Sequence, residues 1–546
     1  MVKGKIKIKT SNYVLLTAFY IAVVYNFFNI PLKIQINSVS HIPLLYSIGY
    51  IVAEFLVLYV AVATFLFLFS FSRILLKFWV FVLIIISTII TYYTINYHIA
   101  IEEVLLGTIL EANIEEVSAV ISLKLIIFFI CLAILPIYIF VYKIRITRIT
   151  WLPILERKQN FFSVCKVSLI LCIMLIFSYI LQPALLHGKY VLKNALSLYT
   201  PVNYIAATYM YIFRLSGSTK DLHNIDISKK YPFSFSNKSI KKDNITIVLV
   251  IGESARADHQ SLNGYTRDTN PNLKKVKNLV TYPNVYSCGT LSRVSVTCIL
   301  SRRGHNNLVL PLPENNMISA FNSLGFKTYF LSTQTMYDSR YNYFYLASKD
   351  ANTVKFINKL RVNIASNSEV YDEILLKEID KIQKQKTGNK LIVLYLVGSH
   401  LAYNIRYPKA FKKFKPDNLT RNVYNKALIN SYDNTILYTD YILSKIIERY
   451  RKQRTFLYYV SDHGESLGEG GVYYHGARYE IAPKEQKNVA QFIWASDSMV
   501  SLMGSSWEKI KSNKNNDISQ DYVFHSLFQC LGIKSKIVNK NLSICN

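Results

Sequence analysis

The sequence predicts a chain of two parts, an α-helical membrane domain with five spans and a soluble α/β domain with a central, mostly parallel sheet. Two observations lead to this fold class. Long apolar runs with few charges fill residues 1–185 of the 546-residue chain, as segments that cross a bilayer must. Beyond them, short β-rich apolar runs alternate with mixed segments of helix length, which is typical of a parallel sheet covered on both faces.

Five segments are apolar and long enough to span a bilayer. They are Tyr13–Ile30, Leu44–Ser70, Phe78–His98, Leu123–Tyr142 and Cys165–Leu181. The first is too long for a removed signal peptide and lacks a cleavage site of small residues. Glu54 lies inside the second span, where we expect a neutral or paired carboxyl within the bundle; a role in handling lipid is the alternative.

The charges that flank these spans set the orientation of the chain. Lysine and arginine gather before the first span and in every second loop, whereas the intervening loops are mostly acidic. The positive-inside rule therefore keeps the N-terminus cytoplasmic, and five crossings place everything after about residue 185 on the opposite side. The cations are Lys3, Lys5, Lys7, Lys9, Arg73, Lys77, Lys143, Arg145, Arg148, Arg157 and Lys158, against Lys33, Glu102, Glu103, Glu111, Glu115 and Glu116 on the other side.

A connector follows the last predicted span. Thr200–Leu215 has the aromatic, amphipathic pattern of a short interfacial helix. Ser216–Asn244 is polar, with Ser-Gly-Ser and Lys-Lys clusters, and predicts a linker. We therefore assign 1–185 to the transmembrane domain, 186–244 to the interfacial helix and linker, and 245–546 to the soluble domain.

The formal net charge of +29 raises the question of nucleic-acid binding. The lysines are dispersed, however, and no basic helix, zinc finger or aromatic RNA-binding signature accompanies them. We expect no nucleic-acid partner, because a cationic protein beside an anionic membrane surface accounts better for the charge. We expect the chain to be a monomer.

Polar, chemically active side chains follow three of the four clearest predicted strands. The strands are Ile245–Ile251, Lys327–Leu331, Leu391–Val397 and Thr455–Val460. In parallel sheets active sites gather beyond the carboxyl ends of the strands. Glu253 follows the first strand, His400 the third, and the Asp462-His463 pair the fourth.

These strand-end residues are of the types that bind zinc. The adjacent Asp462 and His463 can both act as ligands only in a sharp turn, which Gly464 permits. His475 lies twelve residues after His463, beyond a glycine-rich stretch that can fold back. An Asp or His at one strand end is as readily explained by turn chemistry, but Glu253, His400 and His475 in similar settings favour metal binding.

A hydroxyl-rich loop contains the candidate nucleophile. Spacing alone leaves Thr290, Ser292 and Ser295 open, and each could instead cap the N-terminus of a helix. A metal or base must lower the pKa of such a hydroxyl before it attacks. Cys288 and Cys298 flank the loop closely enough to bridge it, which requires an oxidising compartment.

Several long strings in the soluble domain resemble the phosphoethanolamine transferases, a family that includes the mobile colistin-resistance enzymes and has an alkaline-phosphatase/sulfatase-like catalytic domain. The five spans and one soluble domain are also the architecture of that family. The strings are Gly252–His259, Asn263–Tyr265, Arg267–Thr269, Ser287–Thr290 with Ser295, Val296 and Cys298, Ser461–Glu469, and Ala482–Gln486.

The resemblance implies a bacterial inner-membrane enzyme with a periplasmic catalytic domain. It implies transfer of phosphoethanolamine from phosphatidylethanolamine to a lipopolysaccharide, lipid A or core-sugar acceptor, through a covalent phospho-serine and with release of diacylglycerol. It implies one catalytic zinc and leaves room for a second. The resemblance also implies roles for individual residues. Glu253, Asp462 and His463 would hold the zinc together with the nucleophile Ser292. His400 and His475 would contact the phosphoryl group or a second zinc, with His400 assisting proton transfer, and Glu116 would contact lipid.

The alternatives are a phosphoglycerol transferase of the lipoteichoic acid synthase type, a membrane-anchored sulfatase or phosphatase, and a scaffold that binds no zinc. The chain also departs from the family at four places. Ser292 stands where threonine is usual, which keeps Thr290 as a fallback, and Tyr395 stands where the colistin-resistance type has a histidine. A lysine expected after Leu324–Leu331 is absent, with Asp338 nearby, and Thr108 and Ala112 replace the Asn and Thr usual in the lipid-binding segment.

Overall fold

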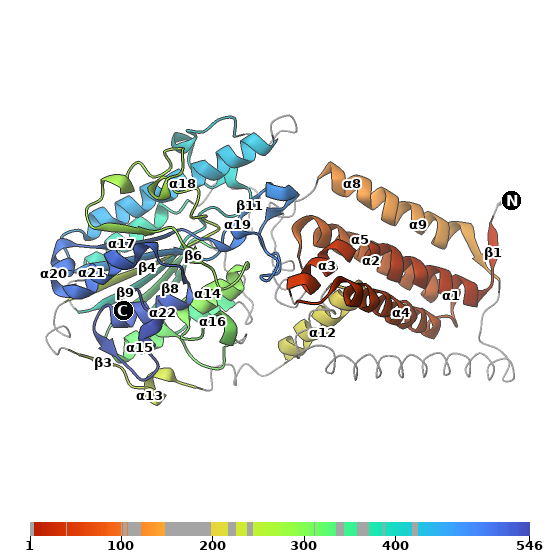
Figure 1. Ribbon diagram of the computed structural model, residues 1–546, viewed down its shortest axis with the longest axis horizontal. Helices are drawn as coiled ribbons and strands as arrows, with labels where there is room; N and C mark the ends of the chain where they lie inside the picture. The colour runs from red at the N-terminus through yellow and green to blue at the C-terminus, as the bar shows by residue number, and fades with distance from the viewer. Residues whose placement is uncertain are drawn as a thin grey trace. The chain divides into compact units, whose positions relative to one another are not determined.

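The computed structural model (Figure 1) describes residues 5–39, 41–99, 101, 106, 122–147, 198–216, 225–236, 244–308, 310, 312–334, 343–357, 371–385, 388–417 and 424–546. The chain divides into two compact units, Met1–Ser216 and Gly217–Asn546. Each unit is described by itself.

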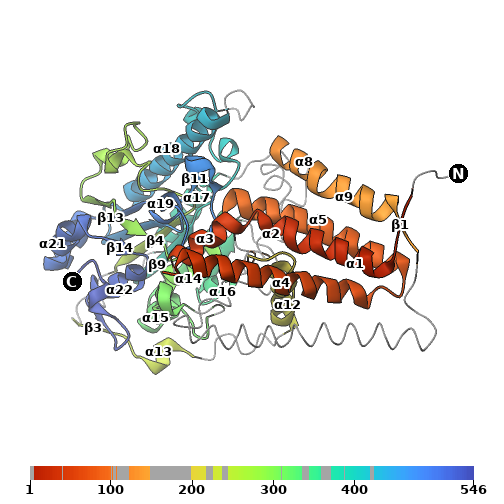
Figure 2. The same cartoon turned by 45° about the vertical axis from the view of Figure 1, so that its right-hand side comes forward.

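The first unit is a bundle of apolar helices. Within the described residues three helices are long and apolar enough to cross a membrane: α4 (Leu44–Leu68), α5 (Arg73–Tyr97) and Leu123–Lys143, with mean hydropathies of 2.5, 2.5 and 2.8. Figures 1 and 2 show α4 and α5 running beside α1 (Thr10–Phe19) and α2 (Tyr25–Phe27). These helices match the predicted second, third and fourth spans, whereas the predicted fifth, Cys165–Leu181, lies outside the described residues.

The predicted first span is interrupted. Thr10–Phe27 is followed after a short break by α3 (Ile30–Val39), which is bent from it by 55°, so the pair counts as one broken span and raises the number to four. Side chains at the break are tied to a distant segment, because Asn26 Nδ2 donates to the Thr200 carbonyl (2.7 Å) and Asn29 Nδ2 to that of Leu198 (2.9 Å).

Glu54 is paired, as expected from its place in the second span. Its carboxylate lies 3.1 Å from Lys33 Nζ and accepts a hydrogen bond from the Tyr199 hydroxyl. The Lys33 ammonium also lies 4.2 Å from the centre of the Tyr199 ring. A partly buried ion pair that holds the segment around Tyr199 is therefore a sufficient role for Glu54.

The helix predicted over Thr200–Leu215 is present as α12 (Val202–Ser216), and it exposes the apolar side chains of Ile205, Tyr209, Ile212 and Phe213. The predicted linker after it is partly folded. Asp226 caps α13 (Ile227–Lys230), and β3 (Ser234–Phe235) pairs with β15 (Ile533–Lys534). The linker predicted over Ser216–Asn244 thus contains folded residues at 225–236, whose apolar side chains pack in the core of the second unit.

A seven-stranded sheet organises the second unit. Its strands lie in the order β5, β13, β10, β4, β9, β7, β8, and all are parallel except β13. Their bounds are Leu279–Tyr282, Gln491–Ala495, Thr455–Ser461, Thr246–Gly252, Lys390–Tyr395, Lys327–Ser332 and Thr353–Phe356. The four strands predicted from the sequence are the four central neighbours, which confirms the mostly parallel sheet.

Helices cover both faces of this sheet (Figure 1). The amphipathic α17 (Ile374–Gln383) and α18 (Tyr424–Tyr450) pack on one face, with Leu375, Ile379 and Ile442 in the core. The other face is covered by α14, α15, α16, α20, α21 and α22, which are Ser292–Leu300, Met317–Ser323, Tyr343–Ser348, Asp497–Met503, Ser505–Ser512 and Asp521–Gln529. The apolar core thus occupies both faces of the sheet, which leaves the strand ends for polar residues.

Candidate metal centre and active site

The carboxyl ends of β4 and β10 bring two predicted ligand segments together. The parallel register pairs Gly252 with Ser461, so Glu253 and Asp462 follow neighbouring strands at the same level. The Asp462 N–H donates to the Gly252 carbonyl (3.1 Å), and the Ser254 N–H donates to Asp462 Oδ1 (3.1 Å). Residues 209 positions apart in the sequence thereby share one corner of the sheet.

Four polar side chains converge at this corner. His463 Nε2 lies 3.4 Å from Glu253 Oε1, 3.5 Å from Asp462 Oδ2 and 3.1 Å from Ser292 Oγ. Ser292 Oγ lies 3.4 Å from Glu253 Oε2. Tetrahedral zinc ligands at about 2.0–2.1 Å from the ion stand roughly 3.3 Å apart, so these spacings fit one zinc ion.

The charges of this cluster also fit a cation. Glu253, Asp462 and His463 are buried, with exposures of 1%, 0% and 0%. Burial, and then the neighbouring Asp462 carboxylate, raises the pKa of Glu253 well above its usual range. Two carboxylates buried side by side repel each other unless a proton or a divalent cation offsets their charge.

The histidine is held in the form that binds a metal. Its Nδ1 lies 2.9 Å from the Gly464 carbonyl, so a proton on Nδ1 leaves the Nε2 lone pair directed at the cluster. Burial lowers the pKa of His463, which favours the neutral ring. Gly464 is required sterically, because a Cβ at this position would lie 2.0 Å from the Glu485 carbonyl oxygen.

The structure distinguishes the three candidate hydroxyls. Ser292 is the first residue of α14, where the helix dipole favours negative charge, and its Oγ belongs to the cluster. Thr290 instead donates to the Ala477 carbonyl (2.5 Å) and Ser295 to that of Gly289 (2.9 Å). Of the three, Ser292 is the one placed to be activated.

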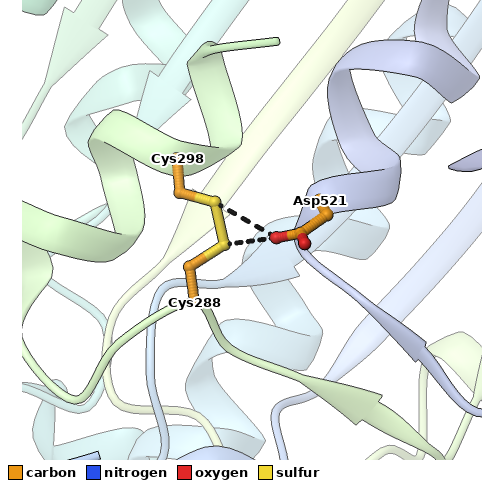
Figure 3. A group of neighbouring side chains, drawn as sticks. All are labelled: Cys288, Cys298 and Asp521. Atoms are coloured by element: carbon orange, nitrogen blue, oxygen red, sulfur yellow. Dashed lines mark hydrogen bonds between the residues drawn. A yellow bond between two sulfur atoms is a disulfide. The ribbon is translucent and has the colours of Figure 1, made fainter. Parts of the chain in front are cut away.

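Two disulfides brace the soluble unit, one of them around Ser292. Cys288 and Cys298 are bonded, and so are Cys530 and Cys545. Figure 3 shows Asp521 beside the first bridge, its Oδ1 2.9 Å from Cys288 Sγ and 3.5 Å from Cys298 Sγ. The bridged sulfurs are not available as thiolates, so this group is structural and does not form a second metal site.

The remaining predicted histidines adjoin the cluster. The rings of His475 and His463 are 4.1 Å apart, and His475 Nδ1 lies 2.7 Å from the buried Glu465 carboxylate. Burial lowers the pKa of His400 well below its usual range, and the nearby Arg406, His475 and His463 lower it further. His400 is therefore a neutral base near the site. Glu116, the predicted lipid contact, lies outside the described residues.

Sequence reasoning missed several residues that orient the ligands. The Tyr395 hydroxyl lies 3.0 Å from Glu253 Oε2, and Gln334 Nε2 donates to the same oxygen (2.9 Å). Gln520 accepts from the Cys288 N–H (2.8 Å) and donates to the Asp462 carbonyl (2.5 Å), so it joins the loop before Ser292 to the turn of Asp462 and His463. No motif marks Gln334 or Gln520, and Tyr395 was noted only where the colistin-resistance type has a histidine, because it otherwise fits an apolar strand.

The fold and this strand-end cluster define a class of protein. The family model described as Sulfatase matches residues 245–533, more than half of the chain, so the chain belongs to the sulfatase family. A second family model, Phosphoethanolamine transferase EptA/EptB, matches residues 58–214.

Individual relatives narrow the assignment. Phosphoethanolamine transferase EptA of Helicobacter pylori is 30% identical over 81% of this chain and 79% of the relative. The chain therefore belongs to the EptA family of phosphoethanolamine transferases. EptA of Escherichia coli K12 is 36% identical over 54% of this chain, and the match spans only 54% of that relative's length.

Solved structures agree with the fold over the whole chain. The integral membrane lipooligosaccharide phosphoethanolamine transferase A of Neisseria meningitidis superposes with a TM-score of 0.77, 22% identity and coverage of 99% of both chains. The periplasmic domain of EcEptC from Escherichia coli, crystallised in complex with Zn, has a TM-score of 0.51 at 23% identity, over 58% of this chain and 89% of that one.

Proposed function

We propose that the chain transfers phosphoethanolamine from phosphatidylethanolamine to a lipid A or core-sugar acceptor, through a phosphorylated Ser292 and with release of diacylglycerol. The observation that carries the proposal is the placement of Ser292 Oγ, at a helix N-terminus and 3.1–3.4 Å from two buried metal-type ligands. The names of the relatives, which include a Kdo(2)-lipid A phosphoethanolamine 7''-transferase, support this substrate class.

Glu253, Asp462, His463 and Ser292 would hold the catalytic zinc. When bound, the ion would lower the pKa of the Ser292 hydroxyl and offset the charge that develops on the phosphoryl oxygens. The donor set matches zinc in residue type, and the zinc complex of the related periplasmic domain supports this choice of metal. His475 adjoins the cluster and would contact the phosphoryl group or a second zinc.

The residues present support a double displacement. In the first step Ser292 Oγ forms a bond to phosphorus, the bond from phosphorus to the glycerol oxygen breaks, and the serine proton is relayed to diacylglycerol. In the second step an acceptor oxygen attacks phosphorus, the bond to Ser292 breaks, and the acceptor proton returns to the serine. His400, whose ring is neutral and lies near His463 and His475, would accept the serine proton and pass it on.

The membrane unit suits substrates that arrive by lateral diffusion. Apolar helices and the exposed apolar face of α12 would keep the chain at the bilayer. The positive-inside pattern and the two disulfides both support an inner-membrane location with a cytoplasmic N-terminus and a periplasmic catalytic unit.

The test uses the full-length chain in detergent with headgroup-labelled phosphatidylethanolamine. We expect diacylglycerol release, a phosphoethanolamine adduct on the 287–298 peptide by mass spectrometry, and complete loss of the adduct in Ser292→Ala. Ser295→Ala is the matched control and should keep it, because its hydroxyl caps a carbonyl. An adduct that persists in Ser292→Ala would reassign the nucleophile.

The acceptor is tested by adding lipid A, core oligosaccharide or no acceptor to the labelled enzyme. Transfer to either glycolipid supports the proposal. Turnover with water alone would indicate a phosphatase. A labelled adduct from phosphatidylglycerol alone would indicate a phosphoglycerol transferase. Absence of bound zinc in elemental analysis would indicate a scaffold.

A further inference from the structure

Tyr395 is the last residue of β9, and its hydroxyl lies beside the carboxylates of the proposed metal site. The hydroxyl is 3.0 Å from Glu253 Oε2 and 3.4 Å from Asp462 Oδ2, and it is also hydrogen-bonded to Ser292. The side chain is 1% exposed. A single phenol therefore contacts three of the four groups assigned above to the metal and the nucleophile.

We propose that Tyr395 is a positioning residue whose hydroxyl holds Glu253 and Asp462 in the arrangement that binds a divalent cation, and that it thereby sets the affinity of the site for zinc. This inference rests on the proposed function only in taking these carboxylates as the zinc ligands.

Electrostatics make a shared donor valuable here. Buried carboxylates on neighbouring strand ends repel each other and would separate in the absence of a cation. A phenol carries its proton at neutral pH, so Tyr395 can donate to the carboxylate oxygens beside it. Gln334 Nε2 donates to the same Glu253 oxygen, so that carboxylate is fixed from two directions.

The ring of Tyr395 is anchored independently of the hydroxyl. The residue pairs with Ile251 of β4 on one side and with Ser332 of β7 on the other, and it belongs to the hydrophobic core beneath the sheet. Removing only the hydroxyl therefore leaves the packing in place. Tyr395→Phe isolates the hydrogen bonds.

The experiment measures zinc binding by the full-length chain in detergent after removal of metal with a chelator. Zinc is titrated against a fluorescent indicator, and thermal melting is recorded with and without zinc. We expect Tyr395→Phe to weaken zinc binding about 10–100-fold, as loss of an outer hydrogen-bond partner does at zinc sites, with the zinc-free melting temperature unchanged. Tyr458→Phe, a buried tyrosine on β10 whose hydroxyl makes no hydrogen bond to the carboxylates, should bind zinc as the wild type does.

A second replacement separates hydrogen bonding from packing. Para-fluorophenylalanine at Tyr395 fills the space of the hydroxyl but donates nothing, so it should show the same loss of affinity as Tyr395→Phe. Recovery of affinity with the fluorinated ring would assign the effect to packing and overturn the proposal.

Two further outcomes would also overturn it. Wild-type zinc affinity in Tyr395→Phe would remove the role of the hydroxyl while leaving the proposed function intact. Loss of the melting transition in the zinc-free variant would assign the hydroxyl to folding. If the wild-type chain itself bound no zinc, the proposed function would fail instead, and the two failures are thus distinguishable.

Discussion

The turn that carries Asp462 and His463 depends on the absence of a side chain at Gly464. A Cβ there would lie 2.0 Å from the Glu485 carbonyl oxygen, whereas real Cβ contacts stay beyond 3.0 Å. Gly464→Ala must therefore move the two segments apart by at least 1.0 Å, the difference between these values. The obstacle is backbone rather than a flexible side chain, so the metal turn itself has to shift.

The cost can be estimated from the bonds that join these segments. The Gly464 N–H donates to the Gln486 carbonyl (2.9 Å) and the Glu465 N–H to that of Glu485 (2.8 Å). Losing both would lower the stability by roughly 2 kcal/mol, at about 1 kcal/mol each. A displacement of about 1 Å in a catalytic group lowers the rate on the order of 100-fold.

We therefore expect Gly464→Ala to bind zinc at least tenfold more weakly and to release diacylglycerol on the order of 100-fold more slowly. Indicator titration and a fluorescent-lipid assay measure the two quantities. Gly470→Ala is the control in the same loop, since nothing lies within 4 Å of its Cβ position, although its φ of 58° costs alanine about 1–2 kcal/mol. Zinc affinity and rate within twofold of the wild type in Gly464→Ala would refute the steric reasoning.

Three other predictions concern stability. Burial lowers the pKa of His525 from 6.5 to about 4, so below pH 6.5 the unfolded chain takes up a proton that the folded chain does not. The free energy of unfolding of the second unit should therefore fall by about 2 kcal/mol between pH 7.5 and pH 5. In denaturant titrations at these two pH values, His525→Gln should reduce this fall. Replacing Cys288 and Cys298 together by alanine should lower the free energy of unfolding by about 2–4 kcal/mol and slow the labelling of Ser292. The same change at Cys530 and Cys545 should lower the stability as much but leave labelling unchanged. Equal labelling rates in the two double variants would contradict this prediction. Removal of metal by a chelator should lower the melting temperature. Added zinc should restore it, whereas added magnesium should not.

Much of the second unit could be predicted from the sequence because its central strands are buried on both faces. β4 and β9 are continuous apolar runs, and burial of both faces leaves no alternation to obscure them. The edge strands β5 and β8 are short and half-exposed, with patterns that any loop can show. The antiparallel β13 was missed because its pairing with β10 is decided by register across the sheet.

The membrane unit shows where local pattern stops being informative. Hydropathy locates α4 and α5 well, because a segment that spans a bilayer is selected for its apolar composition. It does not predict the break after Phe27, because the side chains of Asn26 and Asn29 bond to carbonyls near residue 200. Such a contact exists only once distant segments have met.

The candidate site divides in the same way. Glu253, Asp462 and His463 could be predicted because strand-end loops of a parallel sheet must meet at one edge. Ser292 could not be separated from its neighbouring hydroxyls until the structure placed Thr290 on the Ala477 carbonyl. Tyr395 was noted only as a departure from the histidine of the colistin-resistance type, and no role was assigned to it, since a tyrosine in an apolar strand is expected to pack.

The proposed zinc would account for the unfavourable burial of two carboxylates at this corner of the sheet. Glu253 and Asp462 are buried next to each other with exposures of 1% and 0%, an arrangement that opposes folding while both carry charge. Hydrogen bonds from Ser254, Gln334 and Tyr395 to Glu253 offset part of that cost. All of these donors surround a carboxylate, so they stabilise its negative charge. A fold that needed only stability would place apolar residues here. The repulsion supports the proposal of a cation site, in which the binding energy of the ion would also hold Ser292 in place.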